Sequence, residues 1–163
     1  NALSGWSVGF NRQSITSWRK AFEINLTSVF ALTQAAAPHL RKKSKGSVIN
    51  VASIYGIVGP DWRIYGKGMG NPAAYAASKG GLLQLTRWLA TTLAPKIRVN
   101  AISPGGVLRN QKKKFLRNYV DRTPLKRMAL EEDVKGAVVY LASDLSSYMT
   151  GQNLVIDGGW TAW

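Results

Sequence analysis

Two short apolar runs, separated by a segment of helix length, set the fold class of this chain. The runs are Ser47–Ala52 and Ile97–Ile102. Predominantly apolar runs of this length are typical of strands that are buried on both faces of a parallel sheet. Between them, Asn71-Pro72 is a helix start signal, with an N-cap and a proline at the first position, and we expect this helix to reach about Ala94. The order strand, helix, strand predicts an α/β protein with parallel strands.

Periodicity and charge predict the remaining elements. We expect helices over about residues 16–43, Gln111–Asp121 and Glu131–Ala142, a loop over residues 1–13, and a last strand over Asn153–Ile156. Proline has no N–H to donate, so Pro38 should kink the first of these helices or end its regular part.

Composition fits one globular domain and restricts its chemistry. The 163 residues are 45% hydrophobic and are enough to bury a core. The absence of cysteine excludes disulfides and thiolate metal sites, and His39 has no ligand-spaced partners, so we expect no metal. No apolar run approaches the roughly 18 residues that a membrane span needs, and no signal peptide opens the chain. A cytoplasmic protein is therefore the expectation.

The formal net charge is +14, from 22 Lys and Arg against eight Asp and Glu. Such a balance suits nucleic acid, an anionic membrane surface or an acidic substrate. The basic clusters, however, fall at expected helix ends, at Arg41–Lys45 and Lys112–Lys114, and no nucleic-acid motif accompanies them. We therefore expect solvated faces, with an anionic ligand or partner as the alternative, and neither membrane binding nor specific nucleic-acid binding.

A tyrosine and a lysine four residues apart mark a candidate catalytic site. Tyr75 and Lys79 fall on the same face of the expected helix, one turn apart. A free phenol has a pKa of about 10, and a nearby ammonium group stabilises the phenolate, so a tyrosine beside a lysine becomes a usable general acid or base. Ser53 follows the first apolar run, at the carboxyl end of a strand, where open α/β sheets bind ligands.

Ser53, Tyr75-x-x-x-Lys79, Arg98–Gly106 and Asp157–Gly159 resemble the short-chain dehydrogenase/reductase family in their order and context. The resemblance covers nearly the whole chain and implies a Rossmann-like doubly wound parallel sheet. The family's opening strand and Gly-x-x-x-Gly-x-Gly turn do not precede the Asn25 region. Residues 1–163 are therefore expected to form the C-terminal portion of one Rossmann-type domain, with about three strands and their flanking helices and without the N-terminal cofactor-binding half. We expect them to work as part of a longer polypeptide and to bind cofactor poorly alone.

The same resemblance implies hydride transfer between NAD or NADP and a small carbonyl or alcohol substrate. Tyr75 would give or take the substrate proton, Lys79 would assist it and bind the cofactor ribose, and Ser53 would hydrogen-bond the substrate oxygen. Asn25 would hold a water that links Lys79 to solvent as a proton relay. The cofactor-binding residues implied are Tyr75, Lys79, Pro104, Gly105 and Val107.

The substrate residues are expected in a segment that departs from the family pattern. The strand-end serine and the tyrosine are 22 residues apart, whereas the family usually has about a dozen. The extra segment, Gly59–Gly70, would lie beside the site, and we interpret Trp62, Arg63 and Tyr65 as part of a substrate-recognition wall, with an inert surface excursion as the alternative.

Arg109 stands where the family usually has threonine. It could meet a phosphate or a substrate carboxylate, and a simple solvated arginine is the alternative. The Ser-Ile-Tyr-Gly loop, the Gly-Gly-Val turn and the Trp-rich tail resemble a subgroup associated with bacterial surface-sugar biosynthesis, which implies a sugar-derived substrate.

Apolar residues cover more than one stripe of the helix that follows Pro72, so a second partner is expected to cover it. In the family, this helix and the one that carries Asn25 pack against their copies, which implies a homodimer or a homotetramer. The alternative to an enzyme is a non-catalytic, truncated module that keeps these dimerisation helices. A binder of anions or nucleic acid, recognised by steep salt dependence, is a further alternative.

Overall fold

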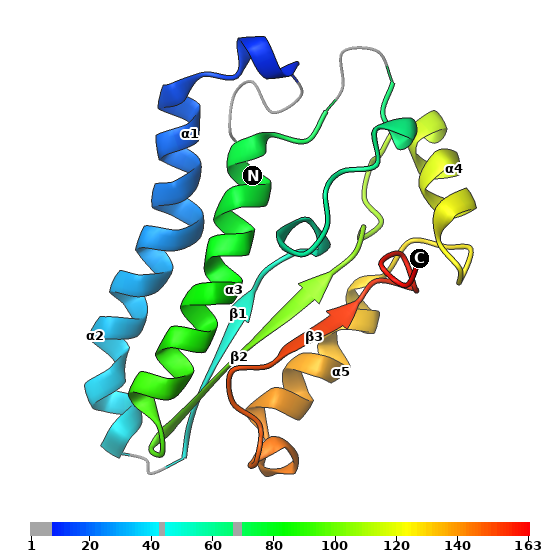
Figure 1. Ribbon diagram of the computed structural model, residues 1–163. Helices are drawn as coiled ribbons and strands as arrows, with labels where there is room; N and C mark the ends of the chain where they lie inside the picture. Colours follow the sequence, from blue (N-terminus) through cyan, green and yellow to red (C-terminus); the bar gives the residue numbers. More distant parts are fainter. Residues whose placement is uncertain (1–7, 43–44, 67–69) are drawn as a thin grey trace.

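A computed structural model, which describes residues 8–42, 45–66 and 70–163, shows a three-stranded parallel sheet with helices on both sides (Figure 1). The strands are β1 (Gly46–Val51), β2 (Ile97–Pro104) and β3 (Asn153–Ile156), in the order β1-β2-β3. Gly46 pairs with Ile97, and Ala101 pairs with Asn153. The predicted α/β class with parallel strands is confirmed, and the strands lie where the apolar runs placed them.

The helices are α1 (Ile15–Phe22), α2 (Ser28–Lys42), α3 (Ala73–Leu93), α4 (Lys113–Arg122) and α5 (Glu131–Ala142). Short 3₁₀ turns lie at Phe10–Arg12, Ile54–Gly56 (η3), Trp62–Ile64 (η4) and Asp144–Ser146. The bounds of α5 and β3 agree with those expected from the sequence. In the described part of the chain, no helix combines the length and the apolar character that crossing a membrane requires.

The two faces of the sheet contact different helices because successive strand residues point to opposite sides. In β1, Asn50 Nδ2 donates to Thr86 Oγ1 of α3 at 2.9 Å. Ser47 Oγ instead donates to the Leu141 carbonyl at 2.8 Å, in α5. Helix α5 lies behind the sheet in Figure 1, and α3 lies in front of it. Each face of β1 is thus tied to one helix by a buried or half-buried hydrogen bond.

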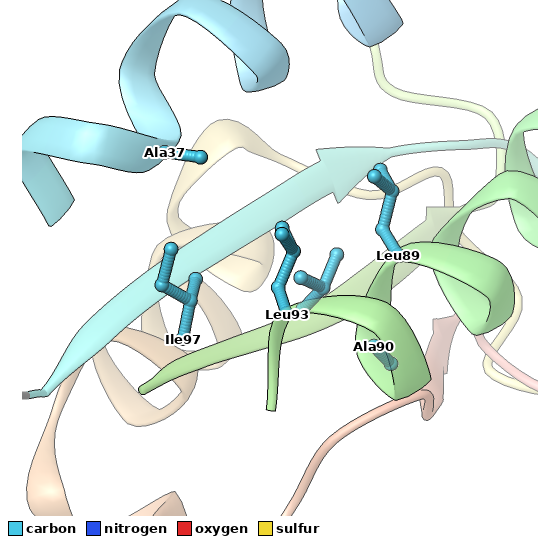
Figure 2. Packing of buried hydrophobic residues seen from close by; sticks show 6 residues of the cluster. Ala37, Leu89, Ala90, Leu93 and Ile97 are labelled. Carbon is cyan, nitrogen blue, oxygen red and sulfur yellow. The ribbon is translucent and has the colours of Figure 1, made fainter. Parts of the chain in front are cut away.

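An apolar cluster fixes α3 against the sheet. Figure 2 shows this cluster, with labels on Ala37 of α2, on Leu89, Ala90 and Leu93 of α3, and on Ile97 at the start of β2. Fully burying a leucine side chain contributes about 2 kcal/mol, so the two leucines hold the C-terminal half of α3 firmly. The N-terminal half of the same helix carries the candidate catalytic residues.

The long helix expected for residues 16–43 is interrupted. A π-helical segment, Glu23–Thr27, separates α1 from α2. Such segments add a residue to the turn and often occur at functional sites, and here the segment contains Asn25, which is only 8% exposed. Of the two outcomes expected at Pro38, an end to the regular part of the helix is wrong, since α2 continues through it to Lys42, and a kink stays a prediction. Pro38 is exposed, so water can satisfy the carbonyl that a proline leaves unbonded.

The start of α3 also differs from the sequence expectation. Its N-cap position is Pro72, without a side-chain cap, and the N–H of Ala73 donates to Gln13 Oε1 at 3.0 Å. Asn71 is therefore not the N-cap residue. It is 7% exposed and forms part of a cavity wall. The local sequence does not distinguish an asparagine that caps a helix from one that is buried in a cavity wall, because the difference depends on tertiary contacts.

Candidate active site

The carboxyl ends of β1 and β2 meet at a cavity of about 510 Å³. Its lining comes from the loop after β1, the start of α3, the glycine turn after β2, and α4. Ser53, Tyr75, Gly105 and Phe115 are among the lining residues. This location follows from the topology, because the carboxyl ends of parallel strands share one edge of the sheet. The strand-end serine and the helix tyrosine, which are far apart in sequence, therefore border one space.

Ser53 is buried where β1 passes into η3. Its Oγ accepts the N–H of Tyr55 at 3.2 Å and so caps this short turn. A hydroxyl that accepts from the backbone keeps its own proton for donation. The turn thus fixes the serine at the cavity and leaves it able to donate to a ligand oxygen.

Tyr75 and Lys79 lie one turn apart in α3, and Lys79 Nζ is 5.8 Å from the centroid of the Tyr75 ring. The ammonium also donates to the Val51 carbonyl at 2.6 Å, which anchors it at the end of β1. Burial lowers the pKa of Lys79. The expected placement of the cation beside the phenol is therefore present in the structure, while the catalytic roles of both residues stay predictions.

Asn25 is joined to α3 at the residue before the lysine. Its Nδ2 donates to Ser78 Oγ at 3.0 Å, and Ser78 Oγ donates to the Tyr75 carbonyl at 3.0 Å. Asn25 and Lys79 line a second cavity, of about 420 Å³, that runs along β1. The two residues of the expected proton relay therefore border one space, while the relay itself stays a prediction.

Of the residues expected to bind substrate, Tyr65 lines the cavity with Ser53 and Tyr75. Trp62 is 59% exposed and borders a different hollow, beside the start of α3.

Arg63 and Arg109 lie outside the described lining of that cavity as well. Arg63 makes two hydrogen bonds of 2.9 Å to the carboxylate of Asp61, two residues earlier. Arg109 pairs with Glu131 at the start of α5. Each arginine thus forms an ion pair with a neighbouring carboxylate, and the substrate roles expected for Trp62, Arg63 and Arg109 stay predictions.

The glycine turn after β2 contains the residues expected at the cofactor. Gly105 lines the cavity, and Pro104 is the last residue of β2. Val107 pairs with Ala129 in an isolated bridge. A Cβ on Gly106 would lie 2.6 Å from Met128 Cε and 2.8 Å from Tyr119 Cζ, so a larger residue would require these side chains to shift.

Sequence reasoning missed Tyr55 and Tyr119 as cavity residues. Tyr119 Oη accepts the N–H of Gly106 at 2.6 Å, and its ring stacks on Trp160 with centroids 4.2 Å apart. Burial raises the pKa of Tyr119 to about 12. The position of Tyr119 on the apolar side of a short helix was visible in the sequence, but its contact with the glycine turn depends on tertiary packing.

An ionic clamp ties the loop before α3 to α4. Asp61 Oδ1 accepts the N–H of Arg63 at 2.9 Å, and Arg122 Nε donates to Asp61 Oδ2 at 2.7 Å. The hydrogen bonds from Arg63, together with the charge of Arg122, lower the pKa of Asp61 to about 2. Asn118 Nδ2 of α4 also donates to the Arg63 carbonyl. The clamp holds the loop that carries Tyr65 against the helix on the other side of the cavity.

This clamp predicts a loss of stability in acid. The pKa of Asp61 is lower in the folded state, about 2, than in an unfolded chain, about 3.9. The stabilisation is therefore complete above pH ~4 and is lost as the pH falls toward ~2. Circular dichroism melts between these pH values measure it. Asp61→Asn should melt lower than the parent above pH 4 and lose less on acidification. Asp121→Asn is the control, and an Asp61→Asn curve parallel to the parent curve contradicts the clamp.

Comparisons with known proteins find related dehydrogenases and reductases. A family model described as enoyl-(acyl carrier protein) reductase matches residues 6–161. The chain is 40% identical to a cyclopentanol dehydrogenase of Comamonas over 152 residues, which cover 89% of this chain and 57% of the relative. It is 42% identical to trans-4-hydroxycyclohexanecarboxylate dehydrogenase of Sinomonas cyclohexanicum, over 91% of this chain and 53% of the relative. A crystal structure of a short chain dehydrogenase from Leptospira borgpetersenii with bound NAD+ superposes with a TM-score of 0.89 at 41% identity, over 95% of this chain and 60% of that one.

The parallel sheet, with a serine, a tyrosine and a lysine gathered at its carboxyl edge, is the arrangement of an α/β protein whose ligands bind beyond the strand ends. The chain belongs to the short-chain dehydrogenase/reductase family. The family resemblance of the sequence motifs is thereby confirmed. The chain spans between half and two thirds of the length of the relatives named above.

Proposed function

We propose that the protein that contains these residues is an NAD- or NADP-dependent oxidoreductase for small alcohol or carbonyl substrates. The observation that carries the proposal is the cavity at the strand ends, bordered by Ser53 and Tyr75, with Lys79 anchored beside the tyrosine. Relatives named as cyclopentanol dehydrogenase, galactose dehydrogenase and sorbose reductase support alcohols and sugars as the substrate class.

The residues at the glycine turn fit the nicotinamide end of such a cofactor. Gly105 and Gly106 bring backbone to the same cavity as Tyr75, and backbone without side chains lets a flat ring approach closely. Related structures with bound NAD+, NADH and NADP support this cofactor class. Tyr75, Lys79 and the turn at Gly105 would hold it, and the bound cofactor supplies or accepts the hydride.

Side chains of residues 1–163 would transfer the proton and hydrogen-bond to the substrate oxygen. Ser53 donates a hydrogen bond to that oxygen, and the phenol of Tyr75 gives or takes its proton. The ammonium of Lys79 favours the phenolate electrostatically. Asn25, held through Ser78, keeps the π-helical segment against α3 and borders the cavity in which a water can carry the proton onward from Lys79.

We also infer that residues 1–163 form the C-terminal portion of one Rossmann-type domain. In the described residues β1 pairs only with β2, and its last residue, Val51, is 53% exposed. An open strand edge of this kind is a template for further pairing, and the relatives are longer than this chain. A preceding segment would then supply the pyrophosphate site.

Exposed apolar residues on the outer helices, including Leu32 and Trp88, support association with a second copy as a dimer or a tetramer.

A chimera tests the proposed activity. It joins the N-terminal part of the NAD+-binding Leptospira relative, up to the residue aligned with position 1, to residues 1–163. Because the catalytic side chains all lie in this chain, we expect the chimera to reduce NAD+ with cyclic alcohols such as cyclopentanol, measured by the absorbance of the reduced nicotinamide. Residues 1–163 alone should bind NAD+ weakly in calorimetry. A folded chimera that binds NAD+ but turns over no alcohol or sugar would refute the proposal.

A further inference from the structure

The cavity contains a pair of phenols that the proposed proton chemistry does not use. Tyr55 Oη and Tyr65 Oη lie 2.7 Å apart, within hydrogen-bond distance. Tyr55 belongs to η3, directly after the strand-end serine, and Tyr65 follows η4 in the clamped loop. Both side chains line the cavity that Ser53 and Tyr75 border. Two parts of the long interval before α3 therefore meet in the wall of the candidate active site.

The hydrogen bond between the two phenols uses only one of their two protons. A phenol has one proton to donate and lone pairs that accept. Within the pair, one hydroxyl donates to the other, in either direction. Whichever hydroxyl donates, the proton of the other is not used within the pair. One phenolic O–H is thus available to a group in the cavity.

Asn71 extends this polar wall. Its side-chain amide hydrogen-bonds to Tyr65, and it borders the same cavity. Its Oδ1 is buried and, among the described residues, has no hydrogen-bond partner. A buried acceptor without a partner is costly. The three polar side chains, Tyr55, Tyr65 and Asn71, therefore form a network with an unused donor and an unused acceptor.

Both phenols of the pair are neutral groups. Burial raises the pKa of Tyr55 and of Tyr65, and the interaction between the two adds to the rise for Tyr55. They therefore remain protonated across the physiological range and act as hydrogen-bond donors and acceptors without charge. Such groups pair best with a neutral oxygen that both donates and accepts, which is the property of a hydroxyl.

The rest of the wall is largely apolar and aromatic. The rings of Tyr65 and Phe115 have centroids 5.7 Å apart, and those of Phe115 and Tyr119 are 6.0 Å apart. Ile54 and Met128 complete the apolar surface. Among the described lining residues no carboxylate occurs, and Lys112, exposed at the cavity mouth, is the one charged side chain. Aromatic faces beside a row of hydroxyls suit a saturated ring with polar substituents at its edge.

We propose that Tyr55 and Tyr65, supported by Asn71, form a specificity site for a second hydroxyl on a ring-shaped substrate. The substrate class is a saturated ring, alicyclic or a sugar, that carries at least one hydroxyl beyond the one that reacts at Tyr75. The inference rests on the proposed function for the identity of the reacting hydroxyl. The ring packs on Phe115 and Tyr119, and its second hydroxyl accepts from the free phenolic proton.

Equilibrium binding to the chain itself tests the site, because all the residues concerned lie in it. The probes are cyclohexanol and the 1,2-, 1,3- and 1,4-cyclohexanediols, and ligand-observed NMR titration gives each Kd. We expect at least one diol to bind about tenfold more tightly than cyclohexanol, the effect of one added hydrogen bond to a site that would otherwise be left unpaired. The double variant Tyr55→Phe/Tyr65→Phe, which removes both phenolic protons, should abolish this preference with little change for cyclohexanol.

Control variants make the outcome decisive. Tyr148→Phe removes a phenol that is fully exposed and should keep the diol preference. Tyr75→Phe should also keep it, although it abolishes turnover in the chimera, so a failure of the hydride-transfer proposal is distinguishable from a failure of this one. Thermal melts of all variants establish that each is folded. Equal affinity of the parent chain for all four probes, no binding of any diol, or an unchanged preference in the folded Tyr55→Phe/Tyr65→Phe double variant overturns the proposal.

Discussion

Tyr75→Phe is expected to lower the kcat of the chimera by about 100- to 10,000-fold, the range that a positioned proton donor contributes. The substitution removes one oxygen and keeps the ring that lies 5.8 Å from Lys79 Nζ. The packing of α3 should therefore be preserved, and the melting temperature should stay close to that of the parent. Because the phenol acts on the reacting oxygen, the loss should appear in kcat and in kcat/KM together, as expected for an interaction made in the transition state.

The other cavity tyrosines provide the comparison for this variant. The Tyr55→Phe/Tyr65→Phe double variant should raise KM for a diol or sugar substrate more than it lowers kcat, since the two phenols are proposed to bind a remote hydroxyl. Tyr148→Phe, on the surface, should leave both constants unchanged. If Tyr75→Phe retained the turnover of the parent, the proton would have to be exchanged by another group, and the assignment of the active site would be lost.

The fold could be predicted from the sequence to a large extent because its signals are local and repeated. The runs that became β1 and β2 are mostly apolar, as is usual for parallel strands covered on both faces. The acids Glu131, Glu132 and Asp133 mark the first turn of α5, where the helix dipole favours them. The placement of Lys79 beside Tyr75 follows from helix geometry alone, because residues four apart share a face.

The cavity wall could not be predicted in the same way, since its residues depend on partners that are distant in sequence. The ion pair between Arg63 and Asp61 depends on the turn at η4, which no pattern in the sequence indicated. Asn71 carries the sequence signature of a helix cap, yet it is buried in the wall. The contact between Tyr55 and Tyr65 requires two separate turns to meet, and no periodicity in the sequence encodes that meeting.

The π-helical segment is a further example of this limit. Periodicity predicted one continuous helix through Asn25, and the interruption adds a residue to the turn at that point. The asparagine thereby reaches Ser78 of α3. A polar residue in a helix interior is mildly unfavourable, and this cost was the one signal in the sequence that something other than a regular helix was present.

Gly56→Ala is expected to destabilise the protein by about 1–3 kcal/mol, the usual cost of forcing extra volume into a packed site. A Cβ on Gly56 would lie 2.8 Å from both the carbonyl carbon and the carbonyl oxygen of Lys79. These are backbone atoms within α3, so they cannot rotate away as the end of a side chain could. Either η3 or α3 has to shift, and the two elements carry the opposite sides of the candidate active site. We therefore expect kcat to fall as well as the free energy of unfolding.

Gly59→Ala is the matched control for this prediction. It lies three residues further along the same loop, and a Cβ there would meet nothing within 4 Å. Its free energy of unfolding in urea should stay within about 0.5 kcal/mol of the parent, with unchanged turnover in the chimera. If Gly56→Ala proved as stable and as active as Gly59→Ala, the close approach of η3 to α3 would not be needed to hold Ser53 opposite Tyr75. The serine and the tyrosine would then have to be positioned by the strand and the helix separately, without the contact between η3 and α3.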